Sequence, residues 1–255
     1  MITSCLAGGL CNFLFQIAAI QSLAIDNKDI AIFDFDLATQ RHKNIYSYRS
    51  DILRNVNIGK VTPINVYNEP NFHYNNLPYL PNYLYNGYFQ CEKYFIHNRE
   101  IILELFSPTN DTIEYINKKY FNLLNGETCS IHVRRTDYVD RYSEYHPPCT
   151  IEYYKAAINE IKDCDKFLIF SDDINWCKQN FIGNKFTFIE NERDVIDLYL
   201  MSKCKNNIIA NSSFSWWGTW LNINENKKII APKKWFGPAK PLNTNDIYPK
   251  NCIIL

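Results

Sequence analysis

The sequence ETCSIHVRRTDY, residues 127–138, sets two arginines and an aspartate where an apolar strand ends. Its first half has strand character, and side chains along a strand alternate between its two faces. His132 and Arg134 therefore point away from Ile131 and Val133. Open α/β sheets hold their ligands beyond the carboxyl ends of the strands. The stretch thus predicts a crevice to which one strand delivers polar groups.

The paired arginines favour an anionic ligand. Arg134 and Arg135 could grip a diphosphate with forked donors, and Asp137 could orient one of them or meet a hydroxyl. The alternative is an exposed Arg–Asp ion pair, which contributes only ~0–1 kcal/mol. Spacing alone leaves both interpretations open.

Composition limits the class of protein. With 255 residues, 46% of them hydrophobic, the chain can form one large domain or two modest ones. Its 27 basic and 27 acidic residues create no overall field that would attract nucleic acid. An anion site must therefore be local, and no nucleic-acid partner is expected.

The cysteines and the amino terminus indicate a cytoplasmic protein. The nine cysteines are scattered and never spaced as Cys-x-x-Cys, which suggests reduced thiols and neither a zinc site nor a disulfide framework. No stretch approaches the ~18 apolar residues of a transmembrane segment, and signal-peptide features are absent. Peripheral association with the inner membrane face stays an alternative.

The first part of the chain begins as a βαβ unit. Residues 1–6 predict a strand, Gly8 and Gly9 a turn, residues 12–25 a helix, and residues 30–35 a second strand. A glycine turn at a helix amino end suits anions. The dinucleotide fingerprint of three spaced glycines is missing, which disfavours a nicotinamide cofactor.

The next segment is less regular and leads to a domain boundary. Residues 39–84 are expected to be rich in loops, with a short helix at 47–56. A strand at 83–89 and helices at 92–106 and 113–124 precede a break at Asn125-Gly126. We therefore expect one domain over residues 1–125 and another over residues 126–255.

From there strands and helices alternate, which predicts an α/β fold with a parallel sheet flanked by helices. The predicted strands cover residues 128–133, 166–170, 186–189, 207–210 and 228–230. The predicted helices cover residues 151–161, 173–181, 194–202 and 215–221. The unusual polar residues fall in the loops that follow the strands.

A second polar run, NSSFSWWG at residues 211–218, lies where a strand passes into a helix. Its hydroxyls and free backbone N–H groups can hold a phosphate without a metal. The alternative is an ordinary helix cap with tryptophans in the core, and capping does not exclude a phosphate.

Several acids and histidines have two interpretations each. Asp197 lies among apolar residues of its predicted helix and could accept two guanine protons or face solvent. Asp140 and Glu144 follow the arginines and could take a proton from an attacking hydroxyl, or be solvent-facing loop acids. Asp173, with Asp172, is expected to cap a helix. The histidines have no metal-ligand spacing: His42, His73, His97, His132 and His146.

Four separated stretches together resemble a known family. They are GGLCN (residues 8–12), HVRRTDY (132–138), FSDD (170–173) and the segment 197–236, which contains SSFSWWG. In this order they are similar to the GDP-fucose-dependent α-1,2-fucosyltransferases of the bacterial and animal type, glycosyltransferase family 11. The resemblance implies a GT-B fold of two Rossmann-like domains facing a cleft, with residues 1–125 on the acceptor side and residues 126–255 binding the GDP-sugar.

The resemblance also implies roles for individual residues. Arg134 would neutralise the β-phosphate of leaving GDP, supported by Arg135 and Asp137. Glu144 is the candidate base, with Asp140 behind it, although a good leaving group needs little base help. The residues expected to contact the donor, besides Arg134, are Gly9, Asn12, His132, Asp197, Ser212, Ser213 and Phe214.

The implied activity is inverting transfer of L-fucose from GDP-β-L-fucose to the 2-hydroxyl of a terminal β-galactoside, without a cofactor or metal. Another acceptor or GDP-sugar is an alternative. A metal-dependent reaction would use Asp34 and Asp36, which resemble the acid pair of metal-dependent glycosyltransferases. Cys11 and Phe13 replace a glycine and a glutamine of the family pattern. A positive φ at Cys11 would strain the turn, and a non-catalytic binding module is a further alternative.

Overall fold

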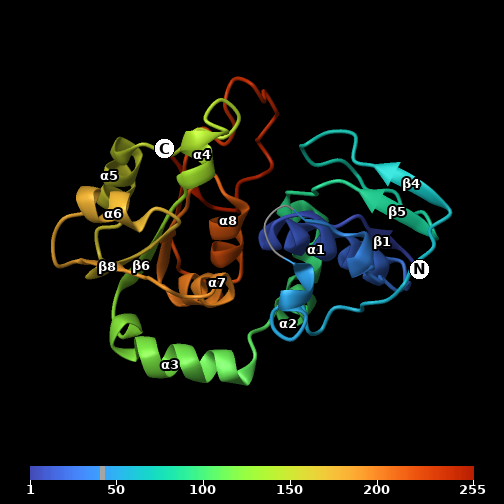
Figure 1. Ribbon diagram of the computed structural model, residues 1–255, viewed down its shortest axis with the longest axis horizontal. Helices are drawn as coiled ribbons and strands as arrows, with labels where there is room; N and C mark the ends of the chain where they lie inside the picture. The colour runs from blue at the N-terminus through green and yellow to red at the C-terminus, as the bar shows by residue number, and fades with distance from the viewer. Residues whose placement is uncertain (41–43) are drawn as a thin grey trace. The chain divides into compact units, whose positions relative to one another are not determined.

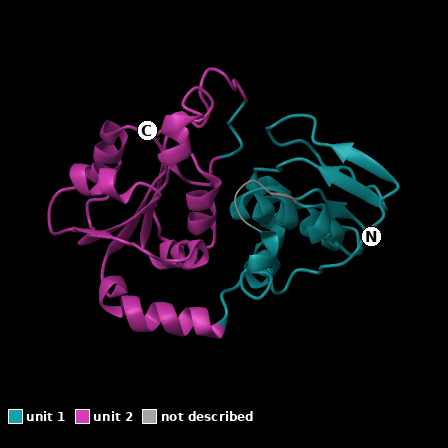
Figure 2. Ribbon diagram, in the orientation of Figure 1, with its two compact units in different colours: residues 1–109, 243–247 teal, residues 110–242, 248–255 magenta. Residues whose placement is uncertain are grey.

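The computed structural model describes residues 1–40 and 44–255, so His42 lies outside the described residues. The chain divides into two compact units, which Figure 2 shows in different colours. The first unit contains residues 1–109 and 243–247, and the second contains residues 110–242 and 248–255.

The second unit is built on a parallel sheet. Within the described residues its six strands lie in the order β11-β10-β9-β6-β7-β8, and every neighbouring pair is parallel. Along the chain, β7 and β8 therefore follow on one side of β6, and β9, β10 and β11 follow on its other side. This reversal falls between β6 and β9. The strands are β6 (Thr128–Val133), β7 (Lys166–Ser171), β8 (Phe186–Phe188), β9 (Asn206–Ile208), β10 (Ile229–Ala231) and β11 (Ile253–Ile254).

Helices lie on both faces of this sheet. In Figure 1, α5 (Ile151–Glu160) and α6 (Ile174–Asn180) lie on one side, and α7 (Asp194–Lys203) and α8 (Ser213–Trp220) on the other. Side chains that accept backbone hydrogen bonds begin three of them: Thr150 caps α5, Asp173 caps α6 and Ser212 caps α8. The predicted alternation of strands and helices is confirmed.

Strand β6 shows the predicted alternation of faces, and all of its residues are buried. Ile131 and Val133 belong to a hydrophobic cluster with Tyr154 of α5. On the opposite face, the hydroxyl of Ser130 accepts a hydrogen bond from Asn207 Nδ2 at 2.7 Å. Because a central strand is covered on both faces, its polar side chains need such partners.

Helix α3 (Asn110–Leu124) groups with the second unit because it is tied to the loop before α7. The Glu192 carboxylate there accepts hydrogen bonds from the hydroxyls of Tyr115 at 2.9 Å and Tyr120 at 2.6 Å. Lys119 pairs with the same carboxylate. The two compact units therefore divide before α3, whereas the domain boundary expected from the sequence lies after it, and that boundary stays a prediction.

The first unit contains shorter parallel strands and one long helix. Among the described residues, β1 (Thr3–Ser4), β5 (Tyr83–Asn86) and β4 (Asn65–Asn68) form one sheet in that order, and β2 (Ala7–Gly8) pairs with β3 (Thr39–Gln40). Helix α1 (Leu10–Asp26) is mostly buried. The strand predicted at residues 30–35 is wrong as a continuous element, since Ala31 and Phe33 make only isolated bridges.

Two predicted helices of the first unit are also wrong in extent. The segment 92–106 forms short 3₁₀ turns and then α2 (Arg99–Leu105), because the backbone of Phe95, with φ −144° and ψ 0°, is not helical. The segment 47–56 contains the end of a 3₁₀ turn, Ile45–Tyr48, and then hydrogen-bonded turns. The nine cysteines all lie within the described residues, and none of them forms a disulfide. In residues 1–40 and 44–255, no helix combines the length and apolarity of a bilayer span.

The glycine turn before α1 depends on Gly8 and not on residue 11. Gly8 has a φ of +93°, and a Cβ there would lie 2.4 Å from Asn12 Nδ2. Cys11 is the second residue of α1, is buried, and is not among the described residues with positive φ. The strain considered for Cys11 therefore does not arise.

The same substitution at the two neighbouring glycines tests this turn. Gly8→Ser should lower the free energy of unfolding by about 1–3 kcal/mol, because it forces an L residue into a left-handed φ and against Asn12. Gly9→Ser is the control, since Gly9 is the extended N-cap residue and has nothing within 4 Å of an added Cβ. Urea unfolding should show no loss for Gly9→Ser; equal losses would contradict this account.

Candidate active site

The candidate site lies at the carboxyl edge of the second unit's sheet, where the strand order reverses between β6 and β9. Loops that leave such a reversal in opposite directions open a crevice that ligands occupy. Arg134 and Arg135 follow β6 directly, and the segment 211–213 leads from β9 into α8.

Arg134 is held on two sides by carboxylates. Its Nη2 lies 2.7 Å from Oδ1 of Asp137, and its Nη1 lies 3.0 Å from Oδ2 of Asp172. The guanidinium carbon also lies 5.6 Å from the centre of the Tyr138 ring. The side chain keeps 31% of its exposure. A guanidinium can pair with a phosphate as well as with a carboxylate, so Arg134 is a candidate phosphate ligand.

Arg135 turns toward α6 instead. Its Nε lies 3.3 Å from Oδ2 of Asp173, and its guanidinium carbon lies 4.1 Å from the centre of the Trp176 ring. Stacking on an aromatic face and pairing with a carboxylate fix a planar guanidinium. This geometry fits the supporting role expected for Arg135.

Asp172 joins both arginines to the loop after β7. Its Oδ1 accepts a hydrogen bond from the backbone N–H of Arg135 at 2.9 Å, and its Oδ2 accepts one from the Thr136 hydroxyl at 2.5 Å. Together with the Arg134 pair, these contacts make Asp172 part of the site. Sequence reasoning missed this role, since the run FSDD indicated only a helix cap, which Asp173 supplies.

The amino end of α8 presents donors to the same edge. Ser212 is the N-cap residue, and its hydroxyl accepts a hydrogen bond from the Phe214 N–H at 3.3 Å. Ser213 is the first residue of the helix, and the Phe214 ring lies 5.4 Å from the His132 ring. Helix amino ends favour anions because their N–H groups and dipole point outward.

His132 is a buried, neutral imidazole beneath this helix end. Burial, and secondarily the nearby Arg134, lower its pKa to about 4, against an opposing effect of Asp172. In the part of the chain that the structure describes, its buried Nδ1 has no hydrogen-bond partner. A neutral imidazole nitrogen without a partner can form a hydrogen bond with a hydroxyl that reaches it.

The buried amide of Asn211 joins the surrounding loops. The side-chain Nδ2 donates to the carbonyl oxygens of Pro147 and Trp235, each at 3.0 Å. The backbone carbonyl of Asn211 accepts a hydrogen bond from the Tyr138 hydroxyl at 3.2 Å. The His146 ring stacks on Tyr138 at 5.0 Å. Asn211 therefore connects the start of α8 with the loops after β6 and β10.

The remaining predicted site residues lie as follows. The Glu144 side chain is exposed on a turn. The backbone carbonyl oxygen of Glu144 accepts a hydrogen bond from the Ala239 N–H at 3.2 Å. Asp197 lies half-buried in the first turn of α7. Gly9 and Asn12 belong to the first unit, where Asn12 Oδ1 accepts a hydrogen bond from Gln90 at 2.8 Å. The structure brings together His132, the arginines, Asp137 and the α8 start.

The acid pair considered for a metal is engaged with a lysine. Lys60 Nζ pairs with Asp36 and lies 3.9 Å from Oδ1 of Asp34, whose other contacts include the Asp36 N–H at 3.0 Å. Among the described residues, no group of three or more His, Cys, Asp or Glu side chains could hold a metal ion. These carboxylates therefore serve a local ion pair and turn.

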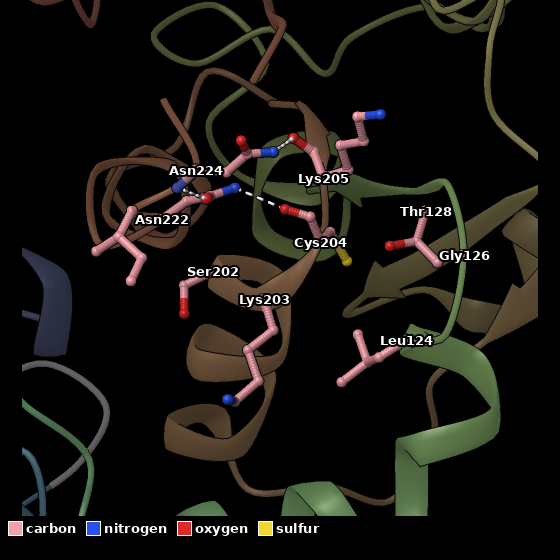
Figure 3. Close-up of a pocket in the computed structure, with 10 residues that line it drawn as sticks. Leu124, Gly126, Thr128, Ser202, Lys203, Cys204, Lys205, Asn222 and Asn224 are labelled. Carbon is pink, nitrogen blue, oxygen red and sulfur yellow. Dashed lines mark hydrogen bonds between the residues drawn. The ribbon is translucent and has the colours of Figure 1, made fainter. Parts of the chain in front are cut away.

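A pocket also lies at the opposite, amino-terminal edge of the sheet (Figure 3). Two of the polar side chains that line it already have partners within the protein. Asn222 Nδ2 donates to the Cys204 carbonyl at 2.7 Å, and Asn224 Nδ2 donates to the Lys205 carbonyl at 3.1 Å. These bonds tie the segment after α8 to the connection between α7 and β9, and the pocket is not our candidate site.

Comparison with known proteins identifies the family. The sequence profile of glycosyl transferase family 11 matches residues 51–254. The chain belongs to glycosyltransferase family 11. It is 32% identical to the O-antigen biosynthesis glycosyltransferase WbnK of Escherichia coli, over 91% of this chain and 94% of that protein. It is 37% identical to an alpha-1,2-colitosyltransferase of Escherichia coli, over 66% of this chain and 60% of that protein.

Solved structures show the fold of this family 11 chain. The fucosyltransferase NodZ from Bradyrhizobium matches with a TM-score of 0.58 at 12% identity, over 86% of this chain and 92% of that one. A glycosyl transferase of family 9 from Veillonella parvula matches with a TM-score of 0.55 at 11% identity, over 100% of this chain and 86% of that one. The predicted α/β, GT-B type fold class is confirmed.

The burial of neutral His132 predicts a pH-dependent stability. Its folded pKa of about 4 lies below the unfolded value of about 6.5, so only the unfolded state gains the proton between these values. Stability from this residue is complete above pH ~6.5 and falls by about 1.4 kcal/mol per unit as the pH drops toward 4. Urea unfolding at pH 7, 6 and 5 should show a steeper loss for wild type than for His132→Gln. Parallel pH profiles would contradict a buried neutral ring.

Proposed function

We propose that this family 11 enzyme transfers L-fucose, with inversion, from GDP-β-L-fucose to the 2-hydroxyl of a terminal β-galactoside. The observation that carries the proposal is Arg134, fixed between two carboxylates at the β6–β9 reversal. The amino end of α8 lies at the same edge and suits a phosphate. The α-1,2-colitosyltransferase relative, which transfers a sugar in the same linkage, supports this choice.

The mechanism rests on stabilising the leaving group. As the bond between fucose and GDP breaks, negative charge grows on the β-phosphate oxygen. Arg134 donates to that oxygen, and the N–H groups near Ser212 and Ser213 add to the stabilisation of this growing charge. Because these donors are fixed before the reaction, they need no reorganisation in the transition state. Arg135 and Asp137 keep the arginine loop in place.

The other predicted contacts complete the donor site. The Nδ1 of His132, which has no partner among the described residues, is our candidate contact for the ribose, and the half-buried carboxylate of Asp197 is our candidate for the guanine. Phe214 is our candidate for contact with the phosphates. We assign the donor to the domain of residues 126–255. Gly9 and Asn12, in the domain of residues 1–125, are our candidates for contacts on the acceptor side of the donor sugar.

Turnover with a panel of acceptors tests the activity. Purified protein with GDP-fucose and β-galactosides should release GDP and form an α-1,2 linkage, read by NMR of the product. Arg134→Ala should lower kcat about 10²–10³-fold, because one preorganised donor to the leaving oxygen is lost. Rates with and without EDTA should be equal, since we propose no metal.

Arg141 offers a matched control because it is an exposed arginine after the same strand. Arg141→Ala should keep wild-type turnover. A folded wild-type protein that binds GDP-fucose without acceptor-dependent turnover would point to the binding-module alternative.

Glu144 is our candidate base for the acceptor hydroxyl. Glu144→Gln should lower kcat about 10²-fold with little change in KM, because general-base help is removed while the side-chain size is kept. Asp140→Asn tests the second acid of the loop in the same assay. Wild-type turnover of both variants would show that positioning and Arg134 suffice.

The 37% identical relative favours one second candidate, transfer of colitose. Colitose is L-fucose without its 3-hydroxyl, so the two donors differ by one polar group. A site that hydrogen-bonds this hydroxyl discriminates strongly against the deoxy sugar. The ratio of kcat/KM for the GDP-fucose and GDP-colitose donors therefore decides between these functions.

A further inference from the structure

The positive charge of the two arginines in the site is offset by neighbouring carboxylates. Two guanidinium groups, Arg134 and Arg135, are paired with three carboxylates, those of Asp137, Asp172 and Asp173, which leaves one negative charge in excess. The neighbouring His132 is neutral. A diphosphate, also negative, must therefore compete with carboxylates that already occupy Arg134.

Asp172 is the carboxylate that can exchange at least cost. Asp137 is three residues from Arg134, in the first turn of helix α4 (Thr136–Asp140), which follows the same strand. Asp172 comes from the loop after β7, and it also accepts hydrogen bonds from the Arg135 N–H at 2.9 Å and the Thr136 hydroxyl at 2.5 Å. If Arg134 leaves, Asp172 keeps both of these partners.

We propose that Asp172 is a positioning residue that holds Arg134 before the donor binds and yields it to the diphosphate, so that Asp172 lowers the affinity for the nucleotide. This inference rests on the proposed function, in which Arg134 binds the β-phosphate. The held arginine is kept off other partners while the site is empty of donor. The exchange frees the full positive charge of Arg134 for the leaving group.

Asp172→Asn separates these effects within one side chain. The asparagine Oδ1 still accepts the Arg135 N–H, and its amide can donate to the Thr136 hydroxyl oxygen, so the loop keeps its bonds. The amide has no charge with which to hold Arg134. Loss of one negative charge several ångströms from a phosphate should tighten binding about tenfold.

Calorimetric titration with GDP and GMP tests the proposal. Asp172→Asn should bind GDP about tenfold tighter than wild type and GMP within about threefold of it, because GMP lacks the β-phosphate. A merely structural role would weaken binding. Equal or weaker GDP binding by a folded Asp172→Asn protein would overturn the proposal.

Two further variants keep the result interpretable. Glu190→Gln removes a carboxylate from the same sheet edge that pairs with Lys178 at 2.9 Å, and it should change GDP affinity by less than about threefold. An equal gain in Glu190→Gln would show a general charge effect and overturn the exchange.

Arg134→Ala should lose GDP affinity; if it does not, the phosphate role in the proposed function fails, whatever Asp172→Asn does. If Asp172→Asn does not fold, Asp172→Ser takes its place with the same expected gain.

Discussion

The carboxyl edge of the second unit depends on the two hydrogen bonds of the Asn211 amide. Both bonds run to carbonyl oxygens, of Pro147 and Trp235, and the Asn211 side chain is buried. Losing the amide would remove the donor of both carbonyls, and the Trp235 carbonyl, whose bond is buried, would be left unsatisfied at a cost above the net value of the bond. The Tyr138 hydroxyl donates to the Asn211 carbonyl, and Arg134 lies over the Tyr138 ring. The Tyr138 ring that contacts the arginine is thus tied to the backbone of a different strand connection.

The two halves of the chain differ in how much of their fold the sequence predicts. In the second unit the predicted strand at residues 128–133 is the observed β6, because its apolar and polar side chains alternate and helices cover both faces of the sheet. In the first unit, the strands β1, β2, β4 and β5 are only two to four residues long and are stabilised by tertiary contacts. Phe95 interrupts a predicted helix because its side chain is buried beside Phe15, at 6.2 Å between ring centres. The local sequence pattern cannot predict where packing against distant residues ends a helix.

For the candidate site, sequence predicts the residues that follow one strand and misses those that meet across strands. Arg134, Asp137 and Ser212 follow from strand ends and a helix start. Asp172 resembles a helix cap in sequence, and its pairing with Arg134 exists only because β7 lies beside β6 in the sheet. The low pKa of His132 likewise comes from burial under α8, which no local motif encodes.

The two departures from the family pattern lie in the core of the first unit and not at an edge. Cys11 and Phe13 are residues of α1, exposed by only 4% and 1%. The turn itself keeps a glycine where φ is positive, at Gly8, and Asn12 keeps a hydrogen-bonded side chain. A core exchange of this kind alters packing and leaves the polar groups of the turn in place. Cys11 and Phe13 therefore do not support the hypothesis of a binding module that has lost catalytic activity. Only the chemistry of the arginine site bears on that hypothesis.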